Sequence, residues 1–179
     1  MPKITGAIAP SGEKLANLIT EIPNLENAKV VIEFGPGTGV FTEKILKKIP
    51  QSAFYFGLEL NPLFVKETLK RCPAALIYQD SAEKAGTYLK MHGLNNCDCI
   101  ISGLPWGIFN KDLQDSILKA VIDVLRPGGE FLTFSYVNAS RLPSSKRFKQ
   151  LIYTKFNIVK TSKIVWKNIP PAFVYHCIK

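Results

Sequence analysis

The chain has 179 residues, of which 46% are hydrophobic, which suits one globular domain with a sizeable core and excludes a disordered segment. No apolar run approaches the roughly 18 residues that a transmembrane helix needs, and no signal-peptide pattern opens the sequence. We therefore expect a cytoplasmic protein, one that could still lie peripherally on the inner face of the membrane.

Hydrophobic periodicity and turn residues predict an alternation of helices and strands in the first part of the chain. Ser11 is placed to cap the first helix, and Asn61 is placed to cap the helix that Pro62 begins. The expected elements are a helix at 13–19, a strand at 29–34, a helix at 40–49, a strand at 54–59, a helix from 62, a strand at 75–79 and a helix that stops at Gly93.

The second part of the chain continues the alternation and then changes. We expect a strand at 97–102, a helix at 112–125, a strand at 130–136, a basic helix at 144–153, and strands at 156–165 and 172–178. The last two strands are too close for a helical crossover, so the final one should be antiparallel. The sequence predicts a single α/β domain over residues 1–179. It should be a three-layer Rossmann-like fold with a mostly parallel seven-stranded sheet and a C-terminal antiparallel hairpin.

The four cysteines show no C-x-x-C spacing, and the two histidines form no cluster with them, so no metal site is expected. Buried, reduced thiols are the predicted state. Cys97 and Cys99 stand two apart on an expected strand, and should therefore point to the same face of the sheet.

The net charge of +9 is unevenly distributed. Residues 1–130 contain all 14 acidic residues and an equal number of Lys and Arg, whereas residues 131–179 contain nine Lys and Arg and no acid. Such segregation favours an anionic partner, either a membrane surface or RNA, bound through residues 131–179. A solvated basic face is the simpler alternative, and charge alone does not choose among them.

A glycine-rich turn follows the first predicted strand, in the order Glu33-Phe34-Gly35-Pro36-Gly37-Thr38-Gly39. A dinucleotide fingerprint would need glycine where Val40 stands, and no Gly-Lys-Ser/Thr follows to make a phosphate-binding P-loop. The remaining pattern, acidic-x-Gly-x-Gly-x-Gly, resembles the S-adenosylmethionine (SAM) motif of class I methyltransferases. That resemblance implies that Glu33 holds the ammonium group of SAM and that the turn, Gly35 to Gly39 with Thr38, passes under its amino-acid and ribose parts. An ordinary glycine-rich turn is the alternative.

Two further acids end predicted strands, and ligands in such sheets bind beyond the carboxyl ends of the strands. Glu59, with Leu60 beside it, is placed to accept both ribose hydroxyls, or else is a surface acid. Asp80 could accept the adenine amino group, with Ser81 beside it. Capping the following helix is an equally physical role for Asp80, and one residue can do both.

The fourth predicted strand runs into Ser102-Gly103-Leu104-Pro105-Trp106, at the position where class I enzymes present the methyl acceptor. A proline in this loop fixes the direction of backbone carbonyls toward an acceptor amine. Trp106 and Phe109 could contact a cation through their rings, or could simply pack in the core or a lid. These five residues, 102–106, are the candidate catalytic residues. Methyl transfer needs no catalytic base, because positioning the attacking lone pair supplies most of the rate.

Four motifs together resemble the bacterial phospholipid N-methyltransferases, a family similar to the ribosomal RNA adenine dimethyltransferases. They are residues 6–11 (Gly-Ala-Ile-Ala-Pro-Ser), residues 33–39, residues 102–105 and residues 166–174 (Trp-x-Asn-x-Pro-Pro-Ala-x-Val). The resemblance implies stepwise methylation of phosphatidylethanolamine, or of a related amine lipid, with SAM as donor.

Other readings remain open at this point. An RNA adenine or small-molecule methyltransferase is one alternative, although the RNA enzymes would show Asn/Asp-Pro-Pro-Phe/Tyr where this chain has Ser-Gly-Leu-Pro. A SAM-binding protein without catalysis that docks on anionic surfaces is another.

Overall fold

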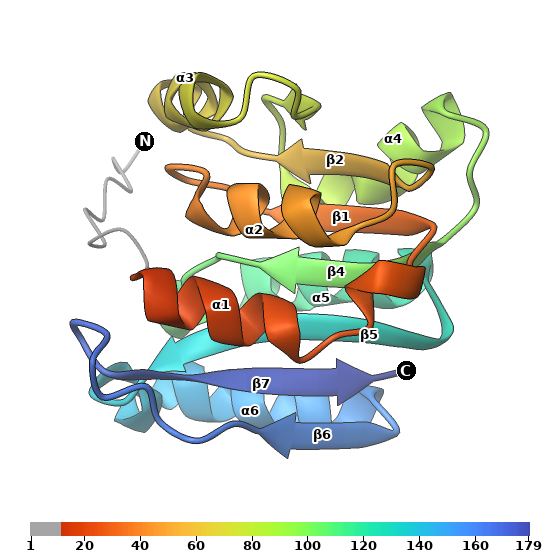
Figure 1. Cartoon of the computed structure of the whole chain (residues 1–179). Helices are drawn as coiled ribbons and strands as arrows, with labels where there is room; N and C mark the ends of the chain where they lie inside the picture. Colours follow the sequence, from red (N-terminus) through yellow and green to blue (C-terminus); the bar gives the residue numbers. More distant parts are fainter. Residues whose placement is uncertain (1–11) are drawn as a thin grey trace.

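A seven-stranded sheet forms the middle layer of the structure, a computed structural model that describes residues 12–179 (Figure 1). Its strand order is β3-β2-β1-β4-β5-β7-β6, and only β7 runs antiparallel to its neighbours. The strands are β1 (Val30–Phe34), β2 (Phe54–Leu58), β3 (Ile77–Tyr78), β4 (Cys97–Ser102), β5 (Leu125–Tyr136), β6 (Ile158–Thr161) and β7 (Ala172–Ile178).

Helices cover both faces of this sheet and complete three layers (Figure 1). One face carries α1 (Glu13–Glu21) and α2 (Val40–Lys48), with α3 (Pro62–Arg71) beside α2. The other carries α4 (Ala85–Met91), α5 (Lys111–Val124) and α6 (Pro143–Lys155). Short 3₁₀ turns, η1 (Leu25–Asn27), η2 (Ala82–Lys84), η3 (Trp106–Ile108) and η4 (Ala139–Arg141), lie between these elements.

The buried side chains form two clusters, one on each face of the sheet. Alternate residues of β1 serve the two clusters, with Ile32 and Phe34 on the α5 side and Val31 on the α2 side. All five residues of β1 are buried, as expected of a central parallel strand covered by helices on both faces. The apolar periodicity of the sequence therefore predicted the layers correctly.

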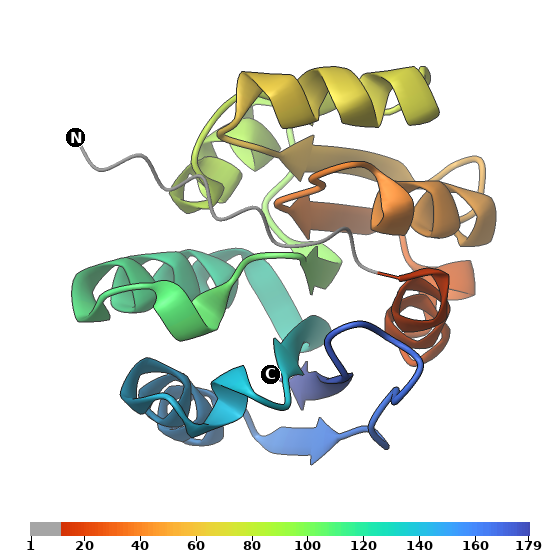
Figure 2. The same ribbon diagram turned by 90° about the vertical axis from the view of Figure 1, so that its left-hand side faces the viewer.

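The strand order reverses between β1 and β4, which pair with each other although β2 and β3 lie between them in the chain. Phe34, the last residue of β1, is the register partner of Ser102, the last residue of β4. The loops that leave these strands therefore start side by side at one edge of the sheet. Figure 2 shows this edge, with the carboxyl ends of the parallel strands toward the viewer. Open α/β sheets bind their ligands at such a point.

The predicted α/β fold with antiparallel C-terminal strands is confirmed, and the differences concern boundaries. β3 keeps only two residues of the expected 75–79, and the strand expected at 156–165 shrinks to β6 plus an isolated bridge from Val165 to Ala172. β5 already begins at Leu125, because this residue pairs with Cys97 before the turn at Gly128, whose φ is +72°. All four cysteines are buried and free, as predicted.

One expectation about β4 was wrong. Cys97 packs in the cluster beneath α5, whereas Cys99 packs in the cluster beneath α2. The pairing register between β4 and β5 shifts between these two residues, and such an irregularity interrupts the alternation that places residues i and i+2 on one face.

The N-terminal helix begins with Gly12 at its N-cap position, where no side chain caps it. Ser11, the expected cap, lies outside the described residues, as does the motif at 6–11. The cap expected from Asn61 is confirmed, since its side chain accepts a hydrogen bond from the backbone N–H of Leu63. Within the described part of the chain, every helix is too short or too polar to cross a bilayer.

Asn168 joins the turn between β6 and β7 to the start of α1, and its replacement should destabilise the protein. The side chain is buried, accepts a hydrogen bond from the N–H of Gly12 (2.9 Å) and donates one to the carbonyl of Pro170 (2.6 Å). We expect Asn168→Ala to lower the free energy of unfolding by about 1–3 kcal/mol, measured by chemical denaturation. Asn157→Ala is the control, because Asn157 is exposed. Equal losses of unfolding free energy in both variants would show that the hydrogen bonds of the Asn168 side chain do not stabilise the protein.

Candidate functional site

The loop between β1 and α2 turns on three glycines with positive φ, Gly35 (+67°), Gly37 (+60°) and Gly39 (+78°). This conformation costs other residues energy, which explains the Gly-x-Gly-x-Gly spacing. A β-carbon on Gly35 would lie 2.8 Å from Leu104, whereas one on Gly37 would meet nothing nearer than 4.0 Å. Gly35 is thus favoured by its positive φ and by its close contact with Leu104, whereas Gly37 leaves open space above the loop.

Two side chains of α3 form hydrogen bonds to the backbone of this glycine loop. The hydroxyl of Thr68 donates to the carbonyl of Gly37 (2.7 Å), and Nε of Arg71 donates to the carbonyl of Thr38 (3.0 Å). The sequence motif did not reveal these partners, since they stand about 30 residues after the loop. No local sequence signal marks Thr68, whose burial becomes evident only in the folded structure.

Glu33 is completely buried at the end of β1. Its Oε2 accepts hydrogen bonds from the hydroxyls of Thr42 (2.8 Å) and Tyr55 (2.6 Å), whereas its Oε1 has no partner among the described residues. Burial raises the pKa of Glu33 to about 7; the two hydroxyl bonds oppose this rise, and the charge of Glu59 adds to it. The carboxyl group therefore combines one satisfied oxygen with one that lacks a donor.

Glu59 follows β2 and connects two segments around the glycine loop. Its Oε2 accepts from the N–H of Gly37 (3.1 Å), and its Oε1 accepts from the N–H of Asn61 (2.9 Å). Each carboxylate oxygen can accept a further hydrogen bond, so these contacts leave acceptor capacity toward a ligand. Leu60 beside it is exposed.

Asp80 and Ser81 follow β3 at the same edge. Asp80 accepts hydrogen bonds from the N–H of Ser81 (2.7 Å) and from the hydroxyl of Tyr88 in α4 (3.0 Å). The capping role considered for Asp80 falls instead to Ser81, whose hydroxyl accepts from the N–H of Glu83 (3.3 Å) at the start of η2. Asp80 precedes the cap by one residue, and its carboxylate turns back to the local backbone.

The loop after β4 lies directly against the glycine loop. The N–H of Gly103 donates to the carbonyl of Phe34 (2.7 Å), and a β-carbon on Gly103 would lie 2.5 Å from the carbonyl oxygen of Gly35. The buried Ser102 hydroxyl accepts from the N–H of Leu104 (3.3 Å), and Leu104 leads into Pro105. The structure thus brings the two predicted loops into contact, as the strand order requires.

Trp106 lies inside the hydrophobic core and does not line an open pocket. Its ring is 2% exposed and stacks on Phe148 of α6, with ring centroids 4.4 Å apart. Its Nε1 donates to the hydroxyl of Ser102 (3.2 Å), and Phe109 meets it edge to face. This position fits the packing alternative, in which Trp106 holds the acceptor loop against the core and presents no free ring face to a ligand.

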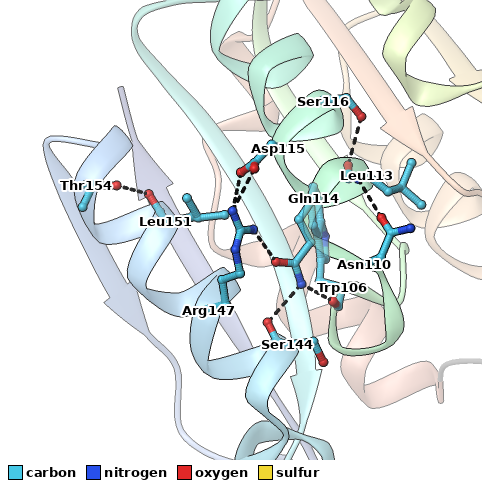
Figure 3. A network of polar contacts seen from close by, with 10 residues as sticks. All are labelled: Trp106, Asn110, Leu113, Gln114, Asp115, Ser116, Ser144, Arg147, Leu151 and Thr154. Carbon is cyan, nitrogen blue, oxygen red and sulfur yellow. Dashed lines mark hydrogen bonds and ion pairs between the residues drawn. The ribbon is translucent and has the colours of Figure 1, made fainter.

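A polar network behind this loop joins α5 to α6, as Figure 3 shows. The buried amide of Gln114 donates to the carbonyls of Trp106 (2.8 Å) and Ser144 (3.0 Å), and its oxygen accepts from Nη1 of Arg147 (2.9 Å). Arg147 also binds both oxygens of Asp115 (2.7 and 2.8 Å). The guanidinium of Arg147 is therefore already bound within the protein, although the side chain is partly exposed.

The arrangement fits the predicted donor. Carboxylates lie at the ends of β1, β2 and β3, and that of Glu59 is bonded to the glycine loop. Oε1 of Glu33, which has no partner within residues 12–179, is an acceptor that suits a cationic group. The candidate acceptor loop touches the same turn. Among residues 12–179, no three His, Cys, Asp or Glu side chains are grouped to hold a metal ion.

Replacing Glu33 should change how stability depends on pH. Because the pKa of Glu33 rises from 4.5 to about 7 on folding, the folded protein retains a proton that the unfolded chain releases between these values. The free energy of unfolding of the wild type should therefore fall by on the order of 3 kcal/mol as pH rises through this window. Glu33→Gln should remove this contribution, measured by denaturation at several pH values. Parallel curves for the two proteins would contradict the raised pKa.

Replacing Arg147 should destabilise the protein, although the residue looks like part of a basic surface. Arg147→Gln breaks the two hydrogen bonds from Nη2 to Asp115 and the bond from Nη1 to Gln114, and should cost about 1–3 kcal/mol in thermal or chemical denaturation. The neighbouring Lys146 is exposed, so Lys146→Gln removes the same charge and should change stability by about 0.5 kcal/mol or less. Similar effects of the two substitutions would argue against a role of these hydrogen bonds in stability.

Comparison with known proteins agrees with this geometry. The family described as methyltransferase domain matches residues 31–129, from β1 into β5. The ornithine lipid N-methyltransferase of Singulisphaera acidiphila is 28% identical over 174 residues, which cover 96% of this chain and 86% of that protein. The dimethyladenosine transferase of Chaetomium thermophilum is 29% identical over 94 residues, 52% of this chain and 24% of that protein.

Solved structures share the fold at low sequence identity. An O-methyltransferase from Bacillus cereus, solved in complex with SAH, superposes with a TM-score of 0.73 at 12% identity and covers 94% of this chain and 82% of that one. The N-methyltransferase NodS from Bradyrhizobium japonicum gives a TM-score of 0.70 at 11% identity, with 93% of each chain covered. These likenesses confirm the Rossmann-like class I fold.

The family match covers more than half of the chain and includes the glycine loop, both strand-end glutamates and the loop after β4. The fold and the arrangement of these loops agree with it. The chain therefore belongs to the methyltransferase domain family, and it is an enzyme that takes its methyl group from S-adenosylmethionine.

Proposed function

We propose that this enzyme N-methylates a lipid with an amino headgroup, such as an ornithine lipid or phosphatidylethanolamine. The observation that carries the proposal is the contact between the acceptor loop, residues 102–105, and the glycine loop. Gly103 donates to the carbonyl of Phe34 and packs on the backbone of Gly35, so an acceptor on this loop would lie next to the donor site.

The donor-binding roles expected from the sequence form part of the proposal. Glu33 would hold the ammonium group of SAM through its unpartnered Oε1, and Glu59 would accept the ribose hydroxyls. Asp80 with Ser81 would contact the adenine, and the glycine loop would pass beneath the amino-acid part. When bound, SAM supplies a methyl group on a sulfonium, which is a good leaving group.

The chemistry of the acceptor loop favours an amine. Residues 102–105 contain no carboxylate, and Leu104 is packed against the core cluster. An amine must be unprotonated to attack a methyl group, and an apolar surface disfavours its charged form. The loop then needs only to hold the nitrogen in line through its backbone carbonyls and its proline.

The lipid part of the proposal is supported by similarity rather than by geometry. The ornithine lipid N-methyltransferase is related over nearly the whole chain, whereas the dimethyladenosine transferase aligns with only about half of it. The acid-free residues 131–179 suit an anionic lipid surface as the partner. RNA is the competing partner, and the loop sequence Ser-Gly-Leu-Pro differs from the Asn/Asp-Pro-Pro-Phe/Tyr expected of the RNA enzymes.

Incubation of the purified protein with SAM and separate acceptors tests this function. Mass spectrometry should show the ornithine lipid or phosphatidylethanolamine gaining one methyl group at a time, with no gain in ribosomal RNA. Leu104→Asp should lower turnover by roughly one to two orders of magnitude, because a carboxylate beside the amine favours its protonated form.

SAM affinity of this variant, measured by calorimetry, should remain near that of the wild type. Leu69→Asp on α3 is the matched control and should keep full turnover, since Leu69 lies on the surface away from the loop. Methylation of RNA but of neither lipid would refute the proposed acceptor. Normal turnover by Leu104→Asp would place the acceptor elsewhere.

A further inference from the structure

The turn between β6 and β7, residues 162–171, exposes large apolar side chains. Ile169 is 84% exposed and Trp166 is 69% exposed, and Ile164 precedes them on the same segment. Leu142, which ends the η4 turn after β5, is also exposed. A soluble surface rarely leaves an indole and several aliphatic groups in contact with water without a partner for them.

These side chains belong to a segment that is held in place. Asn168 stands between Trp166 and Ile169, yet it is buried and bonded to the N–H of Gly12 and to the carbonyl of Pro170. The N–H of Val165 also donates to the carbonyl of Ala172 (2.7 Å). The outward position of Trp166 and Ile169 is therefore fixed by an inward anchor between them.

The segment after β5 adjoins this turn. The N–H of Val137 donates to the carbonyl of Pro171 (2.9 Å), and η4 and Leu142 follow directly. Figures 1 and 2 both show the end of β5 and the β6–β7 turn next to each other, at the edge where the parallel strands have their carboxyl ends. The glycine loop and the acceptor loop lie at this same edge. η3, which follows the acceptor loop, carries the exposed Ile108, and a β-carbon on its Gly107 would lie 3.9 Å from Ala139 of η4.

Positive charge surrounds the apolar side chains. Arg141, Lys163 and Lys167 are exposed, and none of them forms an ion pair within residues 12–179. Glu13, which follows the Gly12 that Asn168 binds, is paired with Lys44 (2.9 Å). The combination of indole, aliphatic and basic side chains is typical of surfaces that enter the headgroup region of an anionic membrane.

We propose that residues 162–171, together with Arg141 and Leu142, form a docking surface for an anionic membrane, with Trp166 and Ile169 inserted at the interface. This inference rests on the proposed lipid acceptor. Within the basic region 131–179, it places the membrane-binding site at one edge of the sheet. It assigns docking to this edge rather than to helix α6, whose Arg147 is bound to Asp115 and Gln114. Docking there would present the acceptor loop to the lipid headgroups.

Two other occupants fit the surface less well. RNA could stack on Trp166, but it offers no partner for Ile164, Ile169 and Leu142, and base recognition relies on aromatic and polar side chains. A second copy of the chain would bring Arg141, Lys163 and Lys167 against the same positive charges, because a two-fold interface repeats each patch on itself.

Vesicle sedimentation of the full chain tests the surface with two pairs of matched variants. Trp166→Ala/Ile169→Ala should weaken binding to vesicles of phosphatidylcholine and phosphatidylglycerol by about tenfold or more. Met91→Ala/Tyr153→Ala removes exposed apolar groups from α4 and α6 and should bind like the wild type. Vesicles of phosphatidylcholine alone should bind all of these proteins weakly.

Two further double variants test whether vesicle binding depends on where the lysines lie or only on the net charge of the protein. Lys163→Gln/Lys167→Gln should weaken binding to the anionic vesicles severalfold. Lys149→Gln/Lys155→Gln, which removes the same charge from α6, should have little effect. Equal losses in both double variants would mean that only net charge matters, and would overturn the assignment to this edge.

Tryptophan fluorescence gives a direct readout, because the chain has two tryptophans and Trp106 is already buried. Addition of anionic vesicles should shift the wild-type emission to shorter wavelengths, and Trp166→Phe should abolish the shift. An unchanged emission on a sedimenting protein would show that Trp166 stays in water. A shift that requires RNA, or that follows protein concentration without vesicles, would assign the surface to RNA or to a second copy.

The docking surface and the proposed function can fail separately. The Trp166→Ala/Ile169→Ala variant should lose methylation of amine lipids in vesicles and keep it on a short-chain amine lipid dissolved as monomers. If the wild type binds vesicles through Trp166 but methylates no amine lipid, the function is wrong and the docking surface stands. If it methylates vesicle lipids and the variant does so equally, the docking surface is refuted and the function stands.

Discussion

The close contact of two backbones at the point where the strand order reverses is the constraint on which the site depends. The loop after β1 and the loop after β4 meet through the N–H of Gly103 and the carbonyl of Phe34, at a separation that leaves no room for a side chain on Gly103. Donor and acceptor can then be brought together without a separate domain. Thr68 and Arg71 support this contact from α3. Gln114 supports it from α5.

Local sequence signals were sufficient for the layers and for the places where loops leave the sheet. Hydrophobic periodicity and turn residues can be recognised within a few consecutive positions of the sequence. The spacing of glycines likewise indicates where the backbone can adopt a positive φ. Partners that meet only after folding were not predictable in this way. Tyr55 reaches Glu33 from the neighbouring strand, and Thr68 reaches the glycine loop from a later helix. The opposite positions of Cys97 and Cys99 depend on a register shift that no local pattern marks.

The positive charge of residues 131–179 also shows that the number of basic residues does not tell how many are free to bind a partner. A count of lysines and arginines treats them as equivalent, but Arg147 is committed to an internal network, whereas Lys163 and Lys167 are not paired among the described residues. The same contrast holds for the two tryptophans. Trp106 secures the acceptor loop from inside the core, and Trp166 faces outward beside a buried asparagine. Two residues of the same type can therefore have different roles, and their surroundings in the folded protein determine which role each has.

The position of β7 has a consequence for how the chain acquires its structure during synthesis. β7 follows β6 in sequence but lies between β5 and β6, and within residues 12–179 β6 pairs with no other strand. While residues 172–178 remain within the ribosome, β5 presents an open hydrogen-bonding edge and β6 has nothing to join. Unpaired edges of this kind attract other chains. The nascent protein thus stays vulnerable to aggregation until a late segment arrives, and that segment closes the sheet from within.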